Sequence, residues 1–489
     1  MKNSKFLPLM AMSLMTITAC GNPGGQGGEG GEKKGHFTHE VTIKFVQSYA
    51  QGYQAQLQKF VDSFQKEEPY VKINLEDGWI SGNYDTIHNQ TISDIGTGEY
   101  GDLVVCYSDH VVDYIDYGKA VKLEKYMDDG EVGWTKAEKD DIIQGFMQEG
   151  QNFPIEGTYC LPFSKSTEAM FYNASRLFDS ELVTFLAGEG ITMNKAYVES
   201  LTWEELFGKL CPALAKYDAA HPNSPLTVKA DGSLNSYVGY DSDANLFITL
   251  AEQYGYGYTS MDKALGKASL DFDNDNMKGL MKTFADAAKH DYFRTPAAIG
   301  ASYSSNYFVA NNILFSIGST AGVSHQNSET FDVGIARVPQ AAGKAARQIS
   351  QGPSVCILSH GDADRELASW LFYKHLVEKN NTAKWATTVG YLPVRSSAYT
   401  SEIYSEYCDE TGKDARSAEL LAAINAKYSA STNESVFTTP AFKGSSSART
   451  QVGSLMATMF KDVAKGVEIN DAYLKTVFDL AVNNIKKDM

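Results

Sequence analysis

The chain has 489 residues, 43% of them hydrophobic and 12% aromatic, and its formal charge is −17. This length exceeds the roughly 250–300 residues at which a single hydrophobic core stops growing, so two lobes are expected. The hydrophobic share excludes a chain that is disordered throughout. The negative charge argues against nucleic acid as a partner, because it would repel a phosphate backbone.

The first 20 residues have the pattern of a secretory signal. A positively charged start precedes an apolar run over 6–14, which is too short to span a bilayer. Residues 17–20, I-T-A-C, are similar to the lipobox of bacterial lipoproteins, which implies lipidation of Cys20. The alternative is a signal peptide without lipid, in which the cysteine occurs by chance. Residues 21–37 are rich in glycine and polar residues and predict a flexible tether.

The next segment predicts an α/β lobe. Residues 40–49 alternate between apolar and polar, residues 54–66 have the spacing of an amphipathic helix, and 71–75 form a second strand. A strand, a helix and a strand in this order predict a parallel pair with a right-handed crossover. Residues 102–107 are almost continuously apolar, which is typical of a central strand buried on both faces.

Two loops of this lobe carry candidate binding residues. The loop over 78–84 holds Trp79 and Tyr84, and aromatic rings at the carboxyl ends of parallel strands often meet ligands. Trp79 has an alternative interpretation, in which it covers a helix. Asp109 follows the apolar strand and is expected either to cap a helix over 110–117 or to face a cleft.

Residues 158–173 read T-Y-C-L-P-F-S-K-S-T-E-A-M-F-Y-N. They are mostly apolar up to Phe163, small and polar through Thr167, and apolar again to Tyr172. Pro162 cannot donate a ladder hydrogen bond, which suits the end of a strand. The pattern predicts two short strands joined by a polar crossover, as a hinge between two lobes requires.

Further elements are expected along the second half of the chain. Thr202 and Glu205 fit a capping box, which makes Trp203 a core residue. The acidic run over 271–276 lacks the glycine and the glutamate of a calcium-binding loop, so it predicts the start of a helix over 277–288.

Later segments add strands and turns. A strand over 312–322 runs into a turn of small residues, where backbone amides and hydroxyls can approach a ligand closely. Residues 351–358 predict a turn and a strand, and residues 365–377 predict a helix.

The cysteines and the motif inventory give mainly exclusions. Cys106, Cys160 and Cys356 lie in strand-like runs and are interpreted as small buried hydrophobic residues, without a disulfide. The chain has no G-x-S-x-G, H-E-x-x-H or C-x-x-C signature, so no metal site and no cofactor are expected. A glycosidase needs only two carboxylates, and that alternative stays open.

Several stretches resemble the extracellular solute-binding proteins of ABC importers, in the family that includes maltose and glycerol-3-phosphate binders. Residues 158–173 are similar to the run L-P-F-x-x-S-T-x-x-x-Y-Y-N of that family, with Phe171 as a departure. Residues 390–394, G-Y-L-P-V, match almost letter for letter, and residues 331–339 resemble the crossing that returns the chain to the first lobe.

The resemblance implies an α/β, two-lobed periplasmic-binding-protein-like fold of type II. Each lobe would be a mixed, mostly parallel sheet flanked by helices, and the lobes would be joined by hinge crossings. Lobe one is expected over 38–163 plus 338–378, and lobe two over 164–337 plus 379–489. The ligand would lie between the lobes.

The function implied is capture of a sugar, oligosaccharide or polyol and its delivery to an ABC permease. The protein would be a lipid-anchored monomer on the outer face of the cytoplasmic membrane and not an enzyme. One alternative is a glycerol-3-phosphate or phosphodiester binder of the same fold. Two alternatives from other classes are a surface glycosidase and a recognition lipoprotein that does not transport.

The resemblance also implies the ligand contacts. Tyrosine rings would stack on a sugar ring, while carboxylates and hydroxyls would exchange hydrogen bonds with its hydroxyls. Arg449 is similar to the residue that meets the phosphate in glycerol-3-phosphate binders, and its alternative is a surface salt bridge. The candidates are Tyr84, Tyr107, Ser108, Asp109, Ser166, Thr167, Tyr240, Asp241, Asp243, Ser319, Thr320, Gly352, Tyr391 and Arg449.

Overall fold

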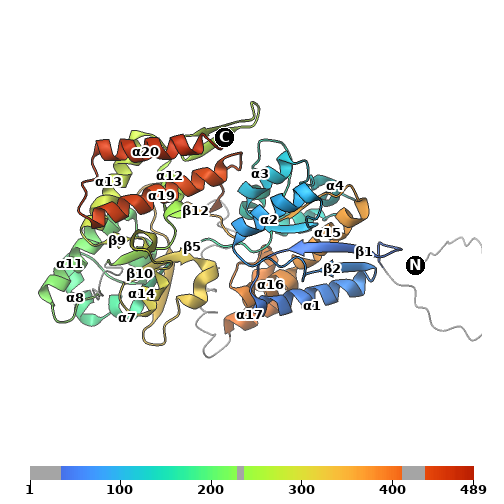
Figure 1. Cartoon of the computed structure of the whole chain (residues 1–489). Helices are drawn as coiled ribbons and strands as arrows, with labels where there is room; N and C mark the ends of the chain where they lie inside the picture. The colour runs from blue at the N-terminus through green and yellow to red at the C-terminus, as the bar shows by residue number, and fades with distance from the viewer. Residues whose placement is uncertain (1–34, 228–235, 410–435) are drawn as a thin grey trace, which may run out of the picture.

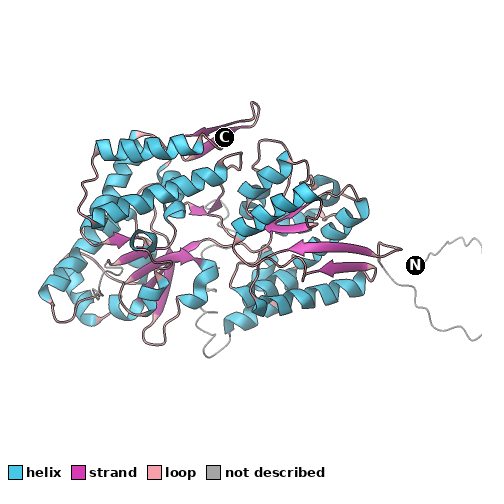
Figure 2. Ribbon diagram, in the orientation of Figure 1, coloured by secondary structure: helices cyan, strands magenta, loops and turns pink. Residues whose placement is uncertain are grey.

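The computed structural model describes residues 35–227, 236–409 and 436–489. Two lobes lie side by side in Figure 1, and each has a sheet of five strands covered by helices, as Figure 2 shows. The predicted signal, lipobox and tether lie almost wholly outside the described residues. Within them, none of the helices combines the length and the apolar character needed to cross a bilayer.

The sheet of lobe one has the strand order β2-β1-β3-β13-β4. Its strands are β1 Val41–Val46, β2 Val71–Asn74, β3 Leu103–Cys106, β4 Leu161–Pro162 and β13 Ser354–Ile357. The helices on this side are α1 Gln51–Glu67, α2 Tyr84–Thr97, α3 Ser108–Asp116, α4 Glu124–Met127, α5 Lys136–Asp141, α6 Gln144–Met147, η1 Gln148–Gln151, α15 Ala363–Leu376, α16 Lys379–Val389 and α17 Glu402–Asp409. The parallel pairing of β1 with β2 and the helix between them confirm the predicted crossover unit.

The sheet of lobe two has the order β11-β5-β10-β6-β9. Its strands are β5 Glu168–Asn173, β6 Val238–Tyr240, β9 Phe293–Arg294, β10 Phe315–Ser319 and β11 Val333–Arg337, and two small pairs are β7 Thr259–Asp262 with β8 Lys267–Leu270 and β12 Gln348–Ile349 with β14 Val436–Phe437. The helices are α7 Ala174–Leu177, α8 Ser180–Gly188, α9 Lys195–Glu199, α10 Trp203–Glu205, α11 Cys211–Ala220, α12 Asp243–Tyr254, α13 Asp275–Lys289, α14 Ser305–Val309, α19 Ser445–Ala464 and α20 Asp471–Ile485. Short helical turns η2 Leu206–Leu210, η3 Pro296–Ile299, η4 Thr320–His325 and η5 Ser396–Thr400 complete the set.

Local sequence signals account for many of these elements. Thr202 accepts a hydrogen bond from the backbone N–H of Glu205, and Trp203 is buried at 2% exposure, both as predicted. Asn274 caps α13, which confirms a helix start instead of a calcium loop. Both sheets are mixed, with equal numbers of parallel and antiparallel pairs and not a parallel majority.

The lobes are joined by chain segments that lie side by side. Residues 164–167 connect β4 with β5, and they pair with the returning segment 350–353 through Ser166 and Gln351, whose backbones exchange hydrogen bonds of 2.8 and 2.9 Å. On the other side, Leu392 donates its backbone N–H to the carbonyl of Lys165 at 2.7 Å. We call residues 164–167 together with 350–353 the crossing.

The structure differs from the predicted boundary at residue 378. Trp385 of α16 lies in the core of lobe one, stacked on Phe163 with a centroid distance of 5.3 Å. Ala386, on the same helix, belongs to a smaller apolar cluster with Phe171 of β5. The sequence assigned all of α16 to lobe two, whereas in the structure its apolar residues are shared by both lobes and its largest one completes the first core.

A candidate ligand site between the lobes

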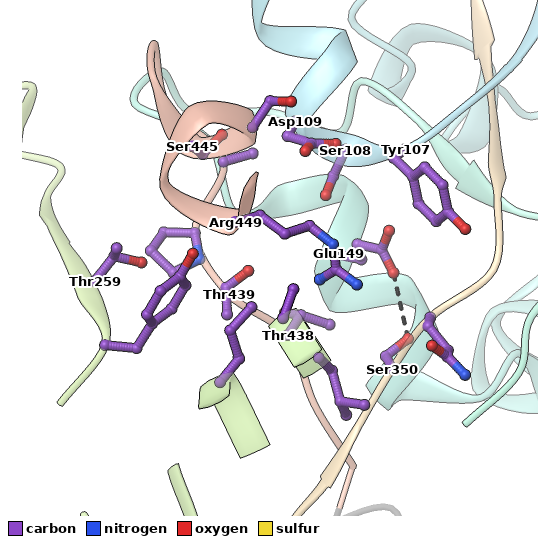
Figure 3. A pocket seen from close by; sticks show the side chains of 18 of the residues that line it. Tyr107, Ser108, Asp109, Glu149, Thr259, Ser350, Thr438, Thr439, Ser445 and Arg449 are labelled. Carbon is purple, nitrogen blue, oxygen red and sulfur yellow. Dashed lines mark hydrogen bonds between the residues drawn. The ribbon is translucent and has the colours of Figure 1, made fainter. Parts of the chain in front are cut away.

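A cavity of about 300 Å³ lies between the two lobes. Its wall is formed by the first turns of α3, η1 and α12, by the end of the crossing, by β7, and by residues 438–453 near the C-terminus (Figure 3). This volume is at the lower end of the roughly 300–1,000 Å³ typical of small-molecule sites. Both lobes and the crossing contribute, so the shape of the cavity depends on how the lobes sit together.

The lobe-one wall follows the central strand β3. All four residues of β3 are buried, and the chain leaves the sheet through Tyr107, which is the N-cap residue of α3. Tyr107, Ser108 and Asp109 all line the cavity. Asp109 lies in the first turn of α3 and also lines the cavity, so it faces the cleft, which is one of its two expected roles.

Behind this wall lies a buried ion pair. Lys165 in the crossing is fully buried, and its Nζ donates to Glu149 Oε2 and to the carbonyl of Gly352, both at 2.6 Å. Glu149 also accepts from the hydroxyl of Ser350 at 3.3 Å, the dashed line in Figure 3. A buried ammonium needs such partners, because burial of an unpaired charge is costly. The pair joins η1 to both strands of the crossing.

The opposite wall is the start of α19. Its N-cap residue Gly444 has a φ of 96° and provides no side-chain cap, and Ser445 and Ser446 of the first turn line the cavity. Arg449 extends from the next turn toward the middle of the cavity (Figure 3). A helix N-terminus and a guanidinium both favour negative charge or the lone pairs of oxygen atoms.

Arg449 is connected to the crossing by a chain of hydrogen bonds. Its guanidinium donates to Asn245 Oδ1, and Asn245 Nδ2 donates to Glu168 at 2.8 Å and to Gln351 at 2.6 Å. Within the described residues, no carboxylate lies within ion-pair distance of Arg449. Burial raises the pKa of Glu168 to about 7, although hydrogen bonds from Tyr240 and Asn245 and the charge of Arg449 oppose this shift.

Four tyrosines stand together beside the cavity. Tyr84 packs edge-on against Tyr107 with a centroid distance of 5.1 Å, and its hydroxyl lies 3.1 Å from that of Tyr391. Tyr49 contacts Ser164 of the crossing through its hydroxyl at 2.7 Å. Burial raises the pKa values of these tyrosines, so each phenol is neutral near pH 7 and can donate a hydrogen bond. Of the four, Tyr107 reaches the cavity wall.

The hydroxyl candidates of the crossing are used internally. Thr167 donates to the carbonyl of Ile349 at 2.8 Å, and the Thr320 hydroxyl accepts from the backbone of Thr167 at 3.2 Å. Ser166, Thr167 and Thr320 are buried and absent from the cavity wall. Ser319 instead caps the turn η4 through Ala321. Gly352, at a φ of 83°, presses against Ser164, and a Cβ there would lie 2.2 Å from the Ser164 carbonyl oxygen.

Three candidates at the end of β6 also lie away from the cavity wall. Tyr240 has no exposed surface and donates its hydroxyl to Glu168, so its ring offers no face for stacking in this conformation. Asp241 accepts from the backbone and hydroxyl of Ser304, both at 2.6 Å. Asp243 accepts from Thr295 at 2.7 Å, and burial raises its pKa to about 6.

Sequence reasoning missed much of the wall. The cavity is also lined by Asp85 and His110, which lie 3.2 Å apart, by Glu149, by Tyr258 and by residues 438–441. One available signal was Lys165, because a lysine between two apolar runs requires a buried acid. The sequence around Glu149 does not identify it as that acid, because a loop separates it from the crossing.

The wall can exchange many hydrogen bonds with a small polar molecule. Asp109 and Glu149 accept, the hydroxyls of Ser108, Thr439 and Ser445 accept and donate, and Arg449 donates. Donors and acceptors face each other across the cavity, which suits a ligand that carries several hydroxyls.

Comparison with known proteins agrees with the two-lobed fold. A family model described as bacterial extracellular solute-binding protein matches residues 59–409. Among solved structures, UgpB from Mycobacterium tuberculosis in complex with glycerophosphocholine superposes with a TM-score of 0.65 at 15% identity, covering 92% of this chain and 99% of that one. MalE from Xanthomonas citri superposes with a TM-score of 0.66 at 14% identity, covering 91% and 98%.

A third similar structure is MalE from Bdellovibrio bacteriovorus bound to maltotriose, with a TM-score of 0.60 and 16% identity, covering 91% of this chain and 100% of that one. At these identities the structural matches establish the two-lobed fold. A search of curated protein sequences finds no match.

Proposed function

The chain belongs to the family of bacterial extracellular solute-binding proteins, and we propose that it captures a carbohydrate between its lobes. It would then deliver this ligand to an ABC permease. The family binds solutes and does not transform them, which removes the glycosidase alternative. The observation that carries the proposal is the cavity between the lobes, with carboxylates on the lobe-one wall and hydroxyls on both walls. Two of the similar structures are sugar-binding proteins by their descriptions, which supports a carbohydrate.

Ligand capture follows from the division of the wall. Tyr107 and Asp109 belong to lobe one, whereas Arg449 and Ser445 belong to lobe two. A ligand that contacts both sets binds the closed arrangement more tightly than an open one, so it shifts the equilibrium by that difference in affinity. The permease would then recognise the closed form.

A thermal-shift screen of the purified protein tests the ligand class. Mono- and oligosaccharides, polyols and glycerophosphodiesters are compared at equal concentrations. A ligand present at 100 times its dissociation constant stabilises the fold by about 2.7 kcal/mol, a shift of several degrees. A shift with a neutral sugar, recovered unchanged, supports the proposal, whereas shifts with phosphodiesters alone would overturn the carbohydrate assignment.

The second candidate ligand is a glycerol phosphate or phosphodiester. Arg449 favours it, because this guanidinium faces the cavity without a carboxylate within ion-pair distance among the described residues. UgpB, with glycerophosphocholine, is one of the similar structures. The variants Arg449→Ala and Arg449→Lys separate the two ligands: a phosphodiester should lose about 100-fold in affinity with alanine and recover partly with lysine, because charge dominates its recognition.

Attachment to the membrane is also part of the proposal. Cys20 would carry the lipid, and the glycine-rich segment after it would let the two lobes move above the bilayer. Fractionation of cells that express the native chain or Cys20→Ala checks this step. The native chain should be recovered with membranes and should incorporate labelled fatty acid, and the variant should do neither; equal partitioning of the two would contradict the anchor.

A further inference from the structure

A cluster of three side chains lies on lobe one, away from the ligand cavity. Glu67 is the last residue of α1, His375 is in the last turn of α15, and Glu378 immediately precedes α16. One oxygen or nitrogen atom from each lies within 4.8 Å of the others. In the described part of the chain this is the one group of histidine, cysteine and carboxylate side chains that is spaced to hold a metal ion.

The orientation of the His375 ring is fixed from behind. Its Nε2 lies 2.8 Å from Ser63 Oγ, and the Ser63 hydroxyl donates its hydrogen to the carbonyl of Phe60 at 3.0 Å. The Ser63 oxygen therefore accepts from Nε2, so the hydrogen of a neutral imidazole sits on Nε2. Nδ1 is left with a lone pair, as a metal-binding nitrogen requires.

That nitrogen points at the two carboxylates. His375 is 6% exposed, and its Nδ1 is buried without a hydrogen-bond partner. Glu378 Oε1 lies 3.7 Å from it, close to the separation of about 3.3 Å between two ligands of a tetrahedral zinc ion with bonds near 2.0 Å. A lone pair facing carboxylate oxygens is repulsive unless a cation lies between them.

Three helix ends meet at the cluster. Both α1 and α15 finish here, with carbonyl groups that carry partial negative charge, and α16 begins immediately after Glu378, with partial positive charge at its N-terminus. Glu67 and Glu378 are exposed and can rotate toward an ion, whereas His375 is held by packing against Phe64. One fixed metal-binding side chain and two that can rotate can together coordinate an ion without movement of the backbone.

We propose that Glu67, His375 and Glu378 bind one divalent transition-metal ion of the zinc class, with water in the remaining coordination position. An imidazole nitrogen with two carboxylates is a ligand set for zinc, whereas calcium and magnesium prefer oxygen ligands alone. The ion would join the end of α1 to the turn between α15 and α16. The site is separate from the ligand cavity, because none of its three protein ligands lines that cavity.

Zinc chloride is the probe for this site. Isothermal titration calorimetry of the purified metal-free protein should give one zinc ion per chain with micromolar affinity, and zinc should raise the melting temperature. Magnesium chloride at the same concentration should do neither. Zinc binding at no defined stoichiometry, or the absence of binding at 100 µM zinc, would overturn the proposal.

Variants locate the ion. Glu378→Gln and Glu67→Gln change exposed residues, so they should fold normally and weaken zinc binding at least tenfold, and His375→Gln should abolish it. Ser63→Ala removes the group that orients the ring and should weaken binding by about tenfold. The matched control is His221→Gln, because His221 faces a single carboxylate, Glu181, at 3.2 Å. Unchanged affinity in both glutamate variants, or loss of binding in the control, would contradict the assignment.

Discussion

The crossing and the cavity wall are both polar, yet they use their polar groups differently. In the crossing, the ammonium of Lys165, the hydroxyl of Thr167 and the backbone of Ser166 all bond to other parts of the protein. In the wall, Asp109 faces the cavity, and Arg449 donates to the amide oxygen of Asn245 with no carboxylate within ion-pair distance among the described residues.

The difference separates scaffold from site. A buried polar group that is paired within the protein fixes one arrangement of the chain, because unpairing it costs free energy. A polar group that faces a cavity with few partners keeps its hydrogen-bonding capacity for a ligand. Substitutions in the crossing should therefore change stability, and substitutions in the wall should change affinity.

The largest effect is expected at Lys165. Lys165→Met leaves the Glu149 carboxylate buried without its counter-ion, so the free energy of unfolding should fall by about 3–5 kcal/mol. Urea denaturation measures the change. The double variant Lys165→Met/Glu149→Gln removes the unpaired charge and should recover part of the loss; a single variant as stable as the native chain would remove the distinction between scaffold and site.

The second prediction concerns the pH dependence of the free energy of unfolding. It depends on Glu168, which lies where the crossing meets the cavity wall. Its pKa is raised to about 7 by burial, whereas an unfolded glutamate titrates near 4.5. Folding therefore favours the protonated form of Glu168. The contribution of this carboxyl group to the free energy of unfolding is complete below pH 4.5, and it is lost as the pH rises to 7. Glu168→Gln removes this dependence, and its stability relative to the native chain should increase by about 2–3 kcal/mol between pH 4.5 and 7.5.

Denaturation curves at several pH values check this prediction. Asp243→Asn serves as a comparison, because the pKa of Asp243 is raised to about 6 and the corresponding gain should end at lower pH. A stability difference that does not change with pH in the Glu168 variant would show that this carboxyl is ionised in the fold.

A third prediction concerns the wall alone. Asp109→Asn removes a charge that faces the cavity, so the affinity for the ligand found in the screen should fall by about tenfold. The melting temperature without ligand should change by less than about 2 °C. Calorimetry measures the first and a thermal melt the second; a destabilised fold with unchanged affinity would place Asp109 in the scaffold.

A fourth prediction makes the same substitution on both sides of the comparison. Thr439→Val removes a hydroxyl from the cavity wall and should lower ligand affinity by about two- to tenfold, with stability unchanged. Thr167→Val leaves the buried carbonyl of Ile349 without its donor and should lower the free energy of unfolding by about 1–3 kcal/mol. Equal effects of the two variants on both quantities would contradict the separation.

The sequence predicted the helices and strands well, but it predicted poorly which side chains contact the ligand cavity. Periodicity and caps gave β1, α1, β3 and α13, because these signals lie within one segment. Tyr240 shows the limit: an aromatic residue at a strand end was expected to meet ligand, but β6 lies between β10 and β9, and this sheet interior buries the ring. The position of a strand in a sheet depends on distant segments and not on its own residues.

The same limit explains the cavity. Ser108 and Asp109 could be predicted because they follow an apolar strand, and Arg449 because a family pattern pointed to it. Asp85, Glu149 and residues 438–441 reach the cavity from elements separated along the chain. Their convergence is a property of the packed lobes, and no local pattern encodes it.

The position of β13 affects the order in which the protein can mature. This strand lies between β3 and β4 in the first sheet, although it follows both of them and all five strands of the second sheet along the chain. At synthesis rates of about 5–20 residues per second, β3 waits at least roughly ten seconds for its neighbour. The first sheet is therefore incomplete until most of the chain has been made, so lobe one can finish folding only late in synthesis.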